Sequence, residues 1–302
     1  MDGTTLTADW VALDWGTTNL RAWAMDRNGG ILAQAISDNG MGKLTRDGYE
    51  PALIALIGGW VNGPMTAVAC GMVGSRQGWV EAPYARTPCP PTPANFVTAP
   101  TRTPGLTVHV IPGIRQDDPA DVMRGEETQI AGFLALNPGW DGVLCLPGTH
   151  TKWVHVSAGE VISFQTVMTG ELFAMIGTQT VLRHSVAADG WDDASFLTAL
   201  ADSFAWPERL AGRFFSLRAE HLLHGLDGAA ARSRLSGLLI GAELAATKPY
   251  WLGQNIAVIG AGAVSRLYVQ ALATVSAPAV LVDGQTVTLA GLTAAYRKIA
   301  GA

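Results

Sequence analysis

The segment Asp14-Trp15-Gly16-Thr17-Thr18 carries residue types that could bind a phosphate group. A phosphoryl group in transfer needs backbone N–H groups and hydroxyls around its oxygen atoms, and a carboxylate that can hold a metal ion. A glycine turn with two threonines supplies the donors, and Asp14 supplies the carboxylate. The segment could equally be an ordinary hairpin turn with solvated threonines, so by itself it does not decide the chemistry.

A second turn of the same kind, Gly148-Thr149-His150-Thr151, appears much later in the chain. Each turn stands in the same pattern of strand, Gly-Thr turn, strand, glycine turn, strand. The expected strands are 10–15, 20–26 and 31–37 in the first copy, and 143–146, 152–156 and 161–167 in the second. A phosphate chain that is bound from two sides needs two such turns. The repeat therefore favours phosphate binding over a pair of ordinary hairpins.

The segment Gly260-Ala261-Gly262-Ala263 follows an apolar run and opens a helical pattern. With Asp283 it comes close to the dinucleotide-binding fingerprint. However, Ser265 stands where that fingerprint has glycine or alanine, and too little chain follows Asp283 to form the remaining strands. We therefore expect a helix start that lies close to a nucleoside, with a plain strand–helix turn as the alternative. The P-loop pattern is absent, because Leu44 follows Gly42-Lys43.

Two adjacent carboxylates, Glu126 and Glu127, open the helical pattern that precedes the second turn. A kinase that acts on a hydroxyl needs a carboxylate to accept its proton. Acidic residues in the first turn of a helix also simply favour the helix dipole. The position of this pair, directly before the second Gly-Thr unit, favours the catalytic interpretation.

Composition excludes several classes of protein. The chain has 302 residues, a net charge of −5, 48% hydrophobic and 15% charged residues, and no basic run. A nucleic-acid partner or a membrane surface is therefore not expected. The three scattered cysteines indicate reduced thiols, and the N-terminus lacks the features of a secretion signal. We expect a cytoplasmic protein.

Helical patterns alternate with the strands that must position these groups, which indicates α/β architecture. The expected helices are 49–60, 125–136, 170–184, 192–205, 211–224, 232–247, 264–274 and 291–300. The proline-rich stretch 88–104 is expected to be an extended surface segment.

Taken together, these motifs make the chain resemble the 2-dehydro-3-deoxygalactonokinase family, within the superfamily that contains actin and hexokinase. The matching segments are LDWGTTNLRAW (13–23), GMVGSRQGWVEAPY (71–84), MRGEETQIAGF (123–133), LPGTHTKWV (146–154), MTGELF (168–173), SGLLIGAEL (236–244) and IGAGAVSRLY (259–268). The resemblance implies a two-lobed actin-like ATPase fold of the ribonuclease H type, each lobe a mixed sheet flanked by helices. The lobes expected are 1–120, completed by a C-terminal helix at 289–302, and 121–288.

The activity implied is transfer of the γ-phosphoryl group of ATP, with Mg²⁺, to the terminal hydroxyl of 2-dehydro-3-deoxy-D-galactonate in galactonate breakdown. By position, the first phosphate turn is assigned Asp14 (also the metal ligand), Gly16, Thr17 and Thr18. The second is assigned Gly148, Thr149 and Thr151, and the adenosine site Gly260, Ala261, Gly262 and Ala263. Related sugar kinases have an aspartate at the start of the junction helix. Here Glu127 is the expected base and Glu126 the alternative.

The sugar-acid pocket is expected in the loop 71–84, which is rich in polar and aromatic groups. Its candidates are Ser75, Arg76, Trp79, Glu81 and Tyr84, with Glu171 for a substrate hydroxyl. Arg76 suits a carboxylate because its fork bonds two oxygens at once. A packed loop with surface charges is the alternative of equal weight.

Three other functions stay open at this point: a kinase for another 2-keto-3-deoxy sugar acid, a non-catalytic nucleotide-dependent clamp, and an NAD-dependent oxidoreductase that uses Gly260 to Asp283. The stereoisomer of the sugar acid and the oligomeric state, including a homodimer, are not readable from the sequence.

Overall fold

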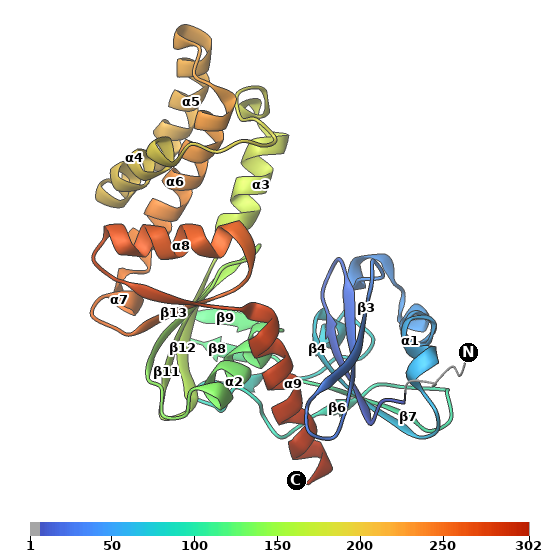
Figure 1. The fold of residues 1–302 in the computed structure, drawn as a ribbon. Helices are drawn as coiled ribbons and strands as arrows, with labels where there is room; N and C mark the ends of the chain where they lie inside the picture. Colours follow the sequence, from blue (N-terminus) through green and yellow to red (C-terminus); the bar gives the residue numbers. More distant parts are fainter. Residues whose placement is uncertain (1–6, 302) are drawn as a thin grey trace. The chain divides into compact units, whose positions relative to one another are not determined.

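A computed structural model describes residues 7–301 (Figure 1). The chain forms two compact units. The first contains the residues up to Asp141, the segment Val156–Ser163 and the residues from Asp283 onward, and the second contains Gly142–His155 and Phe164–Val282. The helix expected at 125–136 thus groups with the first unit, whereas the sequence analysis had assigned it to the second lobe.

The first unit is built on a six-stranded sheet with the strand order β3-β2-β1-β4-β7-β6. Its strands are β1 (Trp10–Trp15), β2 (Leu20–Met25), β3 (Ile31–Ser37), β4 (Met65–Gly71), β6 (Val97–Thr98) and β7 (Leu106–Val110). β1, β2 and β3 pair antiparallel, while β4 joins β1 and β7 joins β4 in parallel. Since β1 is apolar and central, both of its faces are buried.

Helices cover the two faces of this sheet. On one face, α1 (Tyr49–Ile57) packs on the cluster that contains Leu13. On the other face, α9 (Gly284–Ala300) packs on β1 and β4, and Tyr296 stacks on Trp10 with the ring centroids 4.4 Å apart. The helix starts earlier than the expected 291, because the Asp283 carboxylate accepts the Thr286 N–H and caps it.

The helix α2 (Glu126–Leu136) lies directly against α9. Two glycines permit the close approach: a Cβ on Gly132 would lie 1.8 Å from the Val287 carbonyl oxygen, and one on Gly291 would lie 2.0 Å from the Thr128 carbonyl oxygen. The side-chain amide of Gln129 adds a hydrogen bond to the Thr288 hydroxyl at 3.3 Å. Because α9 in turn packs on the sheet, these contacts fix the position of the start of α2 relative to that sheet.

Smaller elements complete the first unit. A three-stranded sheet has the order β5-β8-β9. The remaining strands and short 3-10 helices are β5 (Ala85–Arg86), β8 (Ile114–Asp117), β9 (Ala120–Met123), η1 (Met41–Lys43), η2 (Arg46–Gly48), η3 (Gly58–Trp60) and η4 (Met72–Gly74). The proline-rich stretch 88–104 contains no helix and includes β6, but it is otherwise irregular, and Cys89, Thr92 and Ala99 in it are buried, so it is only partly the extended surface segment expected.

The second unit repeats this arrangement with the order β12-β11-β10-β13-β14. The strands of this sheet are β10 (Gly142–Leu146), β11 (Thr151–Ser157), β12 (Glu160–Val167), β13 (Ile256–Ile259) and β14 (Ala279–Val282). The end of β11 and the start of β12 lie in the segment Val156–Ser163, which groups with the first unit. In both sheets three consecutive strands occupy one edge in reverse order, and a later strand joins the first of the three in parallel. The repeat found in the sequence is thus a repeat of topology.

The helices of the second unit include a bundle formed by α4, α5 and α6, which lie side by side in Figure 1. The unit contains α3 (Thr169–Gln179), α4 (Asp193–Ala205), α5 (Leu210–His224), α6 (Gly228–Ala246), α7 (Lys248–Trp251), α8 (Gly262–Thr274), η5 (Val181–His184) and η6 (Pro207–Arg209). Gly237 and Gly241 let α6 approach the backbone of α4 closely. The predicted α/β class is confirmed. None of the helices between residues 7 and 301 is long and apolar enough to cross a membrane.

Candidate active site

The first Gly-Thr turn joins β1 to β2 and is closed by a hydrogen bond from the Gly16 N–H to the Asn19 carbonyl at 3.0 Å. Thr17 and Thr18 are exposed. The segment after β3 holds the turn from behind: the Gly42 N–H donates to the Thr17 carbonyl at 2.9 Å. A Cβ on Gly40 would lie 2.2 Å from the Thr18 carbonyl carbon, so only glycine fits there.

The second turn joins β10 to β11 and is held in the same way. The Glu171 N–H donates to the Thr149 carbonyl at 2.9 Å, and a Cβ on Gly170 would lie 2.2 Å from the Gly148 carbonyl oxygen. Gly148 and Thr149 are exposed. The carboxylate of Glu171, a predicted substrate contact, lies 2.5 Å from His150 Nε2. In both units a glycine that follows the third strand thus presses on the phosphate turn, a feature that the sequence analysis missed.

Asp14 lies at the end of β1, directly before the first turn. Burial raises the pKa of its carboxyl, and the Arg21 guanidinium at 3.3 Å opposes that shift. A carboxylate that is desolvated but only partly neutralised favours an additional cation. Hard cations such as Mg²⁺ prefer carboxylate oxygen. No cluster of three potential His, Cys, Asp or Glu ligands occurs among the described residues, so ligands other than protein side chains would complete such a site.

Glu127 is fully buried in the first turn of α2, with none of its surface exposed. The Gly125 N–H donates to its Oε2 at 2.6 Å, and the Thr128 hydroxyl donates to its Oε1 at 3.2 Å. Burial, followed by the nearby charge of Glu126, raises the pKa of Glu127 to about 8. A carboxyl with a pKa near the working pH is suited to general-base catalysis.

Glu126 lies differently from its neighbour. It is partly exposed, and its Oε2 accepts the Arg124 N–H at 3.1 Å. Of the two candidates, Glu127 has the environment that suits proton transfer, and its role as the base stays a prediction.

The thiol of Cys70 links the two carboxylates of the first unit. Cys70 is the penultimate residue of β4, the parallel neighbour of β1, and its Sγ lies 4.0 Å from Asp14 Oδ1. Burial raises the pKa of the thiol well above its usual range, and the charges of Asp14 and Glu127 raise it further. Asp14 and Glu127, which stand 113 positions apart in the sequence, thus both raise the pKa of one thiol.

The predicted sugar-acid loop divides into buried and exposed members. Trp79 is only 4% exposed and packs with Trp15 and Tyr49, so it belongs to the core of the first unit. The buried Ser75 hydroxyl contacts the Met41 sulfur at 3.2 Å. The other three members of the loop, Arg76, Glu81 and Tyr84, are exposed.

Arg124, which the sequence analysis did not single out, ties this loop to the start of α2. Its guanidinium lies 4.4 Å from the centroid of the Tyr84 ring and donates to the Ala82 carbonyl at 2.7 Å. Its Nε and Nη1 atoms are buried and have no hydrogen-bond partner in the structure. A positive charge therefore stands two residues before Glu126 and three before Glu127, the two candidate bases.

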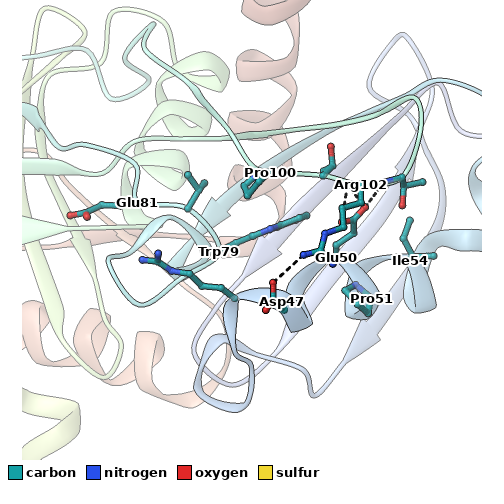
Figure 2. Close-up of a pocket in the computed structure, with 12 residues that line it drawn as sticks. Asp47, Glu50, Pro51, Ile54, Trp79, Glu81, Pro100 and Arg102 are labelled. Atoms are coloured by element: carbon teal, nitrogen blue, oxygen red, sulfur yellow. Dashed lines mark hydrogen bonds and ion pairs between the residues drawn. The ribbon is translucent and has the colours of Figure 1, made fainter.

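An open groove of about 990 Å³ beside the loop is shown in Figure 2. Trp79 and Glu81 line it, but neither Asp14 nor Glu127 does. Arg102 pairs with Asp47 at 3.5 Å, and Glu50 accepts the Arg102 N–H at 2.9 Å. These paired charges connect the segment at Arg102 to the start of α1 and do not involve the loop 71–84.

The second unit has a cavity of about 690 Å³ beside its phosphate turn. Gly148 lines one part of it, and Ala261 and Ala263 line another, so two segments predicted to bind ATP meet in one cavity. Gly260 has no room for a side chain, because a Cβ would lie 2.3 Å from the Ser265 hydroxyl, and Gly262 has a φ of +80°. The predicted glycine-rich helix start is therefore present at the beginning of α8.

The oxidoreductase alternative finds no support at Asp283. Its carboxylate accepts both the N–H and the hydroxyl of Thr286 at 2.8 Å and thereby caps α9. The Asp283 carboxylate thus already accepts hydrogen bonds within the first unit. In a dinucleotide site it would have to bind the ribose hydroxyls instead.

Comparison with known proteins decides the family. Residues 14–295 match the family described as 2-keto-3-deoxy-galactonokinase. The chain belongs to this family. A relative from Rhizobium meliloti (strain 1021), named as a probable 2-dehydro-3-deoxygalactonokinase, is 37% identical over 96% of this chain and 97% of its own length. The 2-dehydro-3-deoxygalactonokinase of Escherichia coli (strain K12) is 34% identical over 95% and 97%.

A crystal structure of a Sinorhizobium meliloti protein described as a 2-dehydro-3-deoxygalactonokinase superposes with a TM-score of 0.87. It is 35% identical and covers 96% of both chains. The fold expected from the resemblance, an α/β actin-like ATPase fold with mixed sheets flanked by helices, is confirmed. The chain is a phosphotransferase of the sugar-kinase type, and the non-catalytic clamp is not favoured.

Proposed function

We propose that this chain transfers the γ-phosphoryl group of ATP to the terminal hydroxyl of 2-dehydro-3-deoxy-D-galactonate. The observation that carries the proposal is that the start of α2 packs against the end of β4, where a Cβ on Gly125 would lie 3.4 Å from Gly71 Cα. The preceding residue, Cys70, has its Sγ 4.0 Å from Asp14 Oδ1, and the chain matches the kinase family over residues 14–295. One carboxylate stands beside an exposed phosphate turn, and the other is tuned for proton transfer. The proposal places the reaction in the cytoplasm, where ATP is supplied.

Glu127 is the proton acceptor in this proposal. The hydroxyl oxygen of the substrate forms a bond to the γ-phosphorus, the bond from that phosphorus to the bridging oxygen of ADP breaks, and the hydroxyl proton passes to the Glu127 carboxylate. The hydrogen bonds from Gly125 and Thr128 hold the carboxyl in place before the reaction. Positioning of this kind reduces the reorganisation needed in the transition state.

Asp14 would hold Mg²⁺, directly or through water, with phosphate oxygens and water completing the coordination. The ion would neutralise charge on the phosphate oxygens. Thr17 and Thr18 supply hydroxyls to the phosphates from the first turn, while Gly148 and Thr149 supply the second turn. The cavity beside Gly148 takes the nucleoside.

The exposed part of the loop 71–84 is the proposed sugar-acid contact. Arg76 has a side chain that is 80% exposed and pairs only loosely with Glu81, at 3.5 Å. It can therefore exchange that partner for the carboxylate of the substrate, which its fork would bond with two oxygens. Glu171 is the proposed partner of a substrate hydroxyl.

A coupled assay of ADP release across a panel of 2-keto-3-deoxy sugar acids tests the proposal. We expect the highest kcat/KM for 2-dehydro-3-deoxy-D-galactonate, and mass spectrometry should place the phosphate on the terminal hydroxyl. A higher kcat/KM for another acid of the panel would move the assignment to that acid. Absence of ADP release with every acid would refute the kinase proposal.

A further inference from the structure

A buried carboxyl group that the proposed reaction does not use lies behind the second phosphate turn. Glu243, on α6, is 3% exposed, although it stands in the apolar segment SGLLIGAEL. Its Oε1 accepts the Trp153 indole N–H at 2.7 Å. Its Oε2 accepts the Tyr268 hydroxyl at 2.7 Å and also the Thr169 hydroxyl. One carboxyl thus receives donors from β11, α3 and α8.

The network continues from Tyr268 to the phosphate turn. The hydroxyl oxygens of Tyr268 and Thr151 are 2.9 Å apart, and both side chains are buried. Tyr268 has a single hydroxyl proton, which it donates to Glu243, so Thr151 must donate its own proton to Tyr268. The Thr151 hydroxyl proton is therefore used in the hydrogen bond to Tyr268. The sequence analysis had assigned this residue to the phosphates of ATP.

Two segments that hold the second phosphate turn are connected to the Glu243 carboxyl. Thr151 follows the turn and starts β11, and Thr169 immediately precedes Gly170, which presses on the Gly148 carbonyl. The next residue, Glu171, donates its N–H to the Thr149 carbonyl. The backbone of the turn is consequently held from two sides; Glu243 bonds directly to Thr169 on one side and reaches Thr151 on the other through Tyr268.

We propose that Glu243 is a positioning residue that sets the second phosphate turn for the phosphates of ATP, acting through Thr169 and through Tyr268 and Thr151. The inference rests on the proposed ATP-binding role of this turn. It assigns Glu243 no contact with substrate. It also assigns Thr151 a supporting role in place of a phosphate contact.

Glu243→Gln provides the first test, because it keeps the side-chain volume but replaces one acceptor oxygen with an NH₂ group, which cannot accept the same donors. We expect the Kd of ATP and of ADP, measured by calorimetry, to rise about tenfold or more, while the Kd of adenosine stays within about twofold. Adenosine lacks phosphates, so loss of its binding as well would indicate general damage to the unit and would overturn the proposal. The matched control is Glu220→Gln. Glu220 lies on α5 of the same unit, and its carboxylate pairs with Arg234. This variant should leave all three values unchanged.

Tyr268→Phe and Thr151→Val separate support from direct contact. In the proposal each variant weakens ATP binding, and the double variant is no worse than the weaker-binding single variant, since both changes break one chain of bonds. If Thr151 bound phosphate directly, Thr151→Val alone would weaken binding and Tyr268→Phe would not. That result would overturn the proposal. Should Glu243→Gln fail to fold, Tyr268→Phe decides by the same criterion.

The wild-type protein separates this inference from the function on which it rests. If it does not bind ATP at all, the proposed function fails and the inference fails with it. If it binds ATP and Glu243→Gln binds ATP equally well, only the inference fails.

Discussion

The backbone N–H of Gly125 donates to Oε2 of Glu127 over 2.6 Å, so the Glu127 carboxyl is turned back toward the start of its own helix and is fully buried there. The adjacent Glu126 is partly exposed and bonds to the Arg124 N–H instead. Two neighbouring glutamates therefore have distinct environments, and this difference makes their roles separable by experiment.

Glu127→Gln should lower kcat at least about a hundredfold, because a positioned carboxylate base contributes typically 10²–10⁴-fold. The amide keeps the shape of the side chain, so ATP and sugar-acid binding should persist in calorimetry. Glu126→Gln is the matched control and should lose much less. A larger loss in Glu126→Gln would transfer the role to Glu126, and near-normal rates in both would exclude both.

The pH dependence of catalysis should follow the Glu127 carboxyl. Its pKa is raised to about 8, so the base is largely protonated at pH 7. We expect kcat/KM for the sugar acid to rise with pH and level off above an apparent pKa of about 8, since this parameter reports the free enzyme. A profile measured from pH 6 to pH 9 that stays flat would contradict this assignment.

Stability should respond to pH in the opposite direction. Between the unfolded pKa of 4.5 and the folded pKa of about 8, the folded protein holds a proton on Glu127 that the unfolded chain has lost. Stability therefore falls as pH rises, by at most about 1.4 kcal/mol per pH unit for one proton. Because Glu127→Gln cannot titrate, its stability relative to the wild type should increase from pH 5 to pH 8 in urea unfolding. A constant difference would argue against the raised pKa.

Asp14→Asn should reduce turnover far more than it weakens ATP binding. Removing the carboxylate removes the proposed ligand of Mg²⁺, and metal stabilisation of transition-state charge is worth several kcal/mol, or about a hundredfold or more in rate. The check is kcat together with the Kd of ATP at a series of Mg²⁺ concentrations. Wild-type rates in this variant would rule out the role.

Gly40→Ala and Gly170→Ala should each disturb one phosphate turn. At both positions a Cβ would lie 2.2 Å from a backbone atom of the turn. We expect a loss of about 1–3 kcal/mol in stability and a higher KM for ATP. The controls are Gly59→Ala and Gly212→Ala, where a Cβ meets nothing within 4 Å. Gly212, inside α5, should even gain about 0.5–1 kcal/mol as alanine. Equal effects in all four variants would refute the argument.

Local patterns carried much of the fold. The hairpin strands and most helices lie close to their predicted ranges, because apolar runs and glycine turns specify them locally. The helix α9 was predicted seven residues too short, since Asp283 was considered only as part of a nucleotide fingerprint and not as a cap. The short pairing of β5 with β8 depends on contacts between distant segments and has no local pattern.

The candidate site shows the same division. Glu126 and Glu127 were found because they stand together in a helix start, but the sequence could not show which is buried. The sequence analysis did not single out Glu243, which stands as a charge inside an apolar stretch. A lone carboxyl in a helix that is otherwise buried must find donors, and that requirement was the available signal. Its donors come from three distant segments, so the sequence could not name them.

The return of α9 to the first sheet has a consequence for synthesis of the chain. Trp10 stacks on Tyr296, and Leu292 and Ala295 complete the same core, so β1 gains its final cover only when residues 284–300 have left the ribosome. By then every residue of the second unit, which ends at Val282, has already been made. We therefore expect the second unit to reach its native contacts first during translation, although the polypeptide begins with the other one.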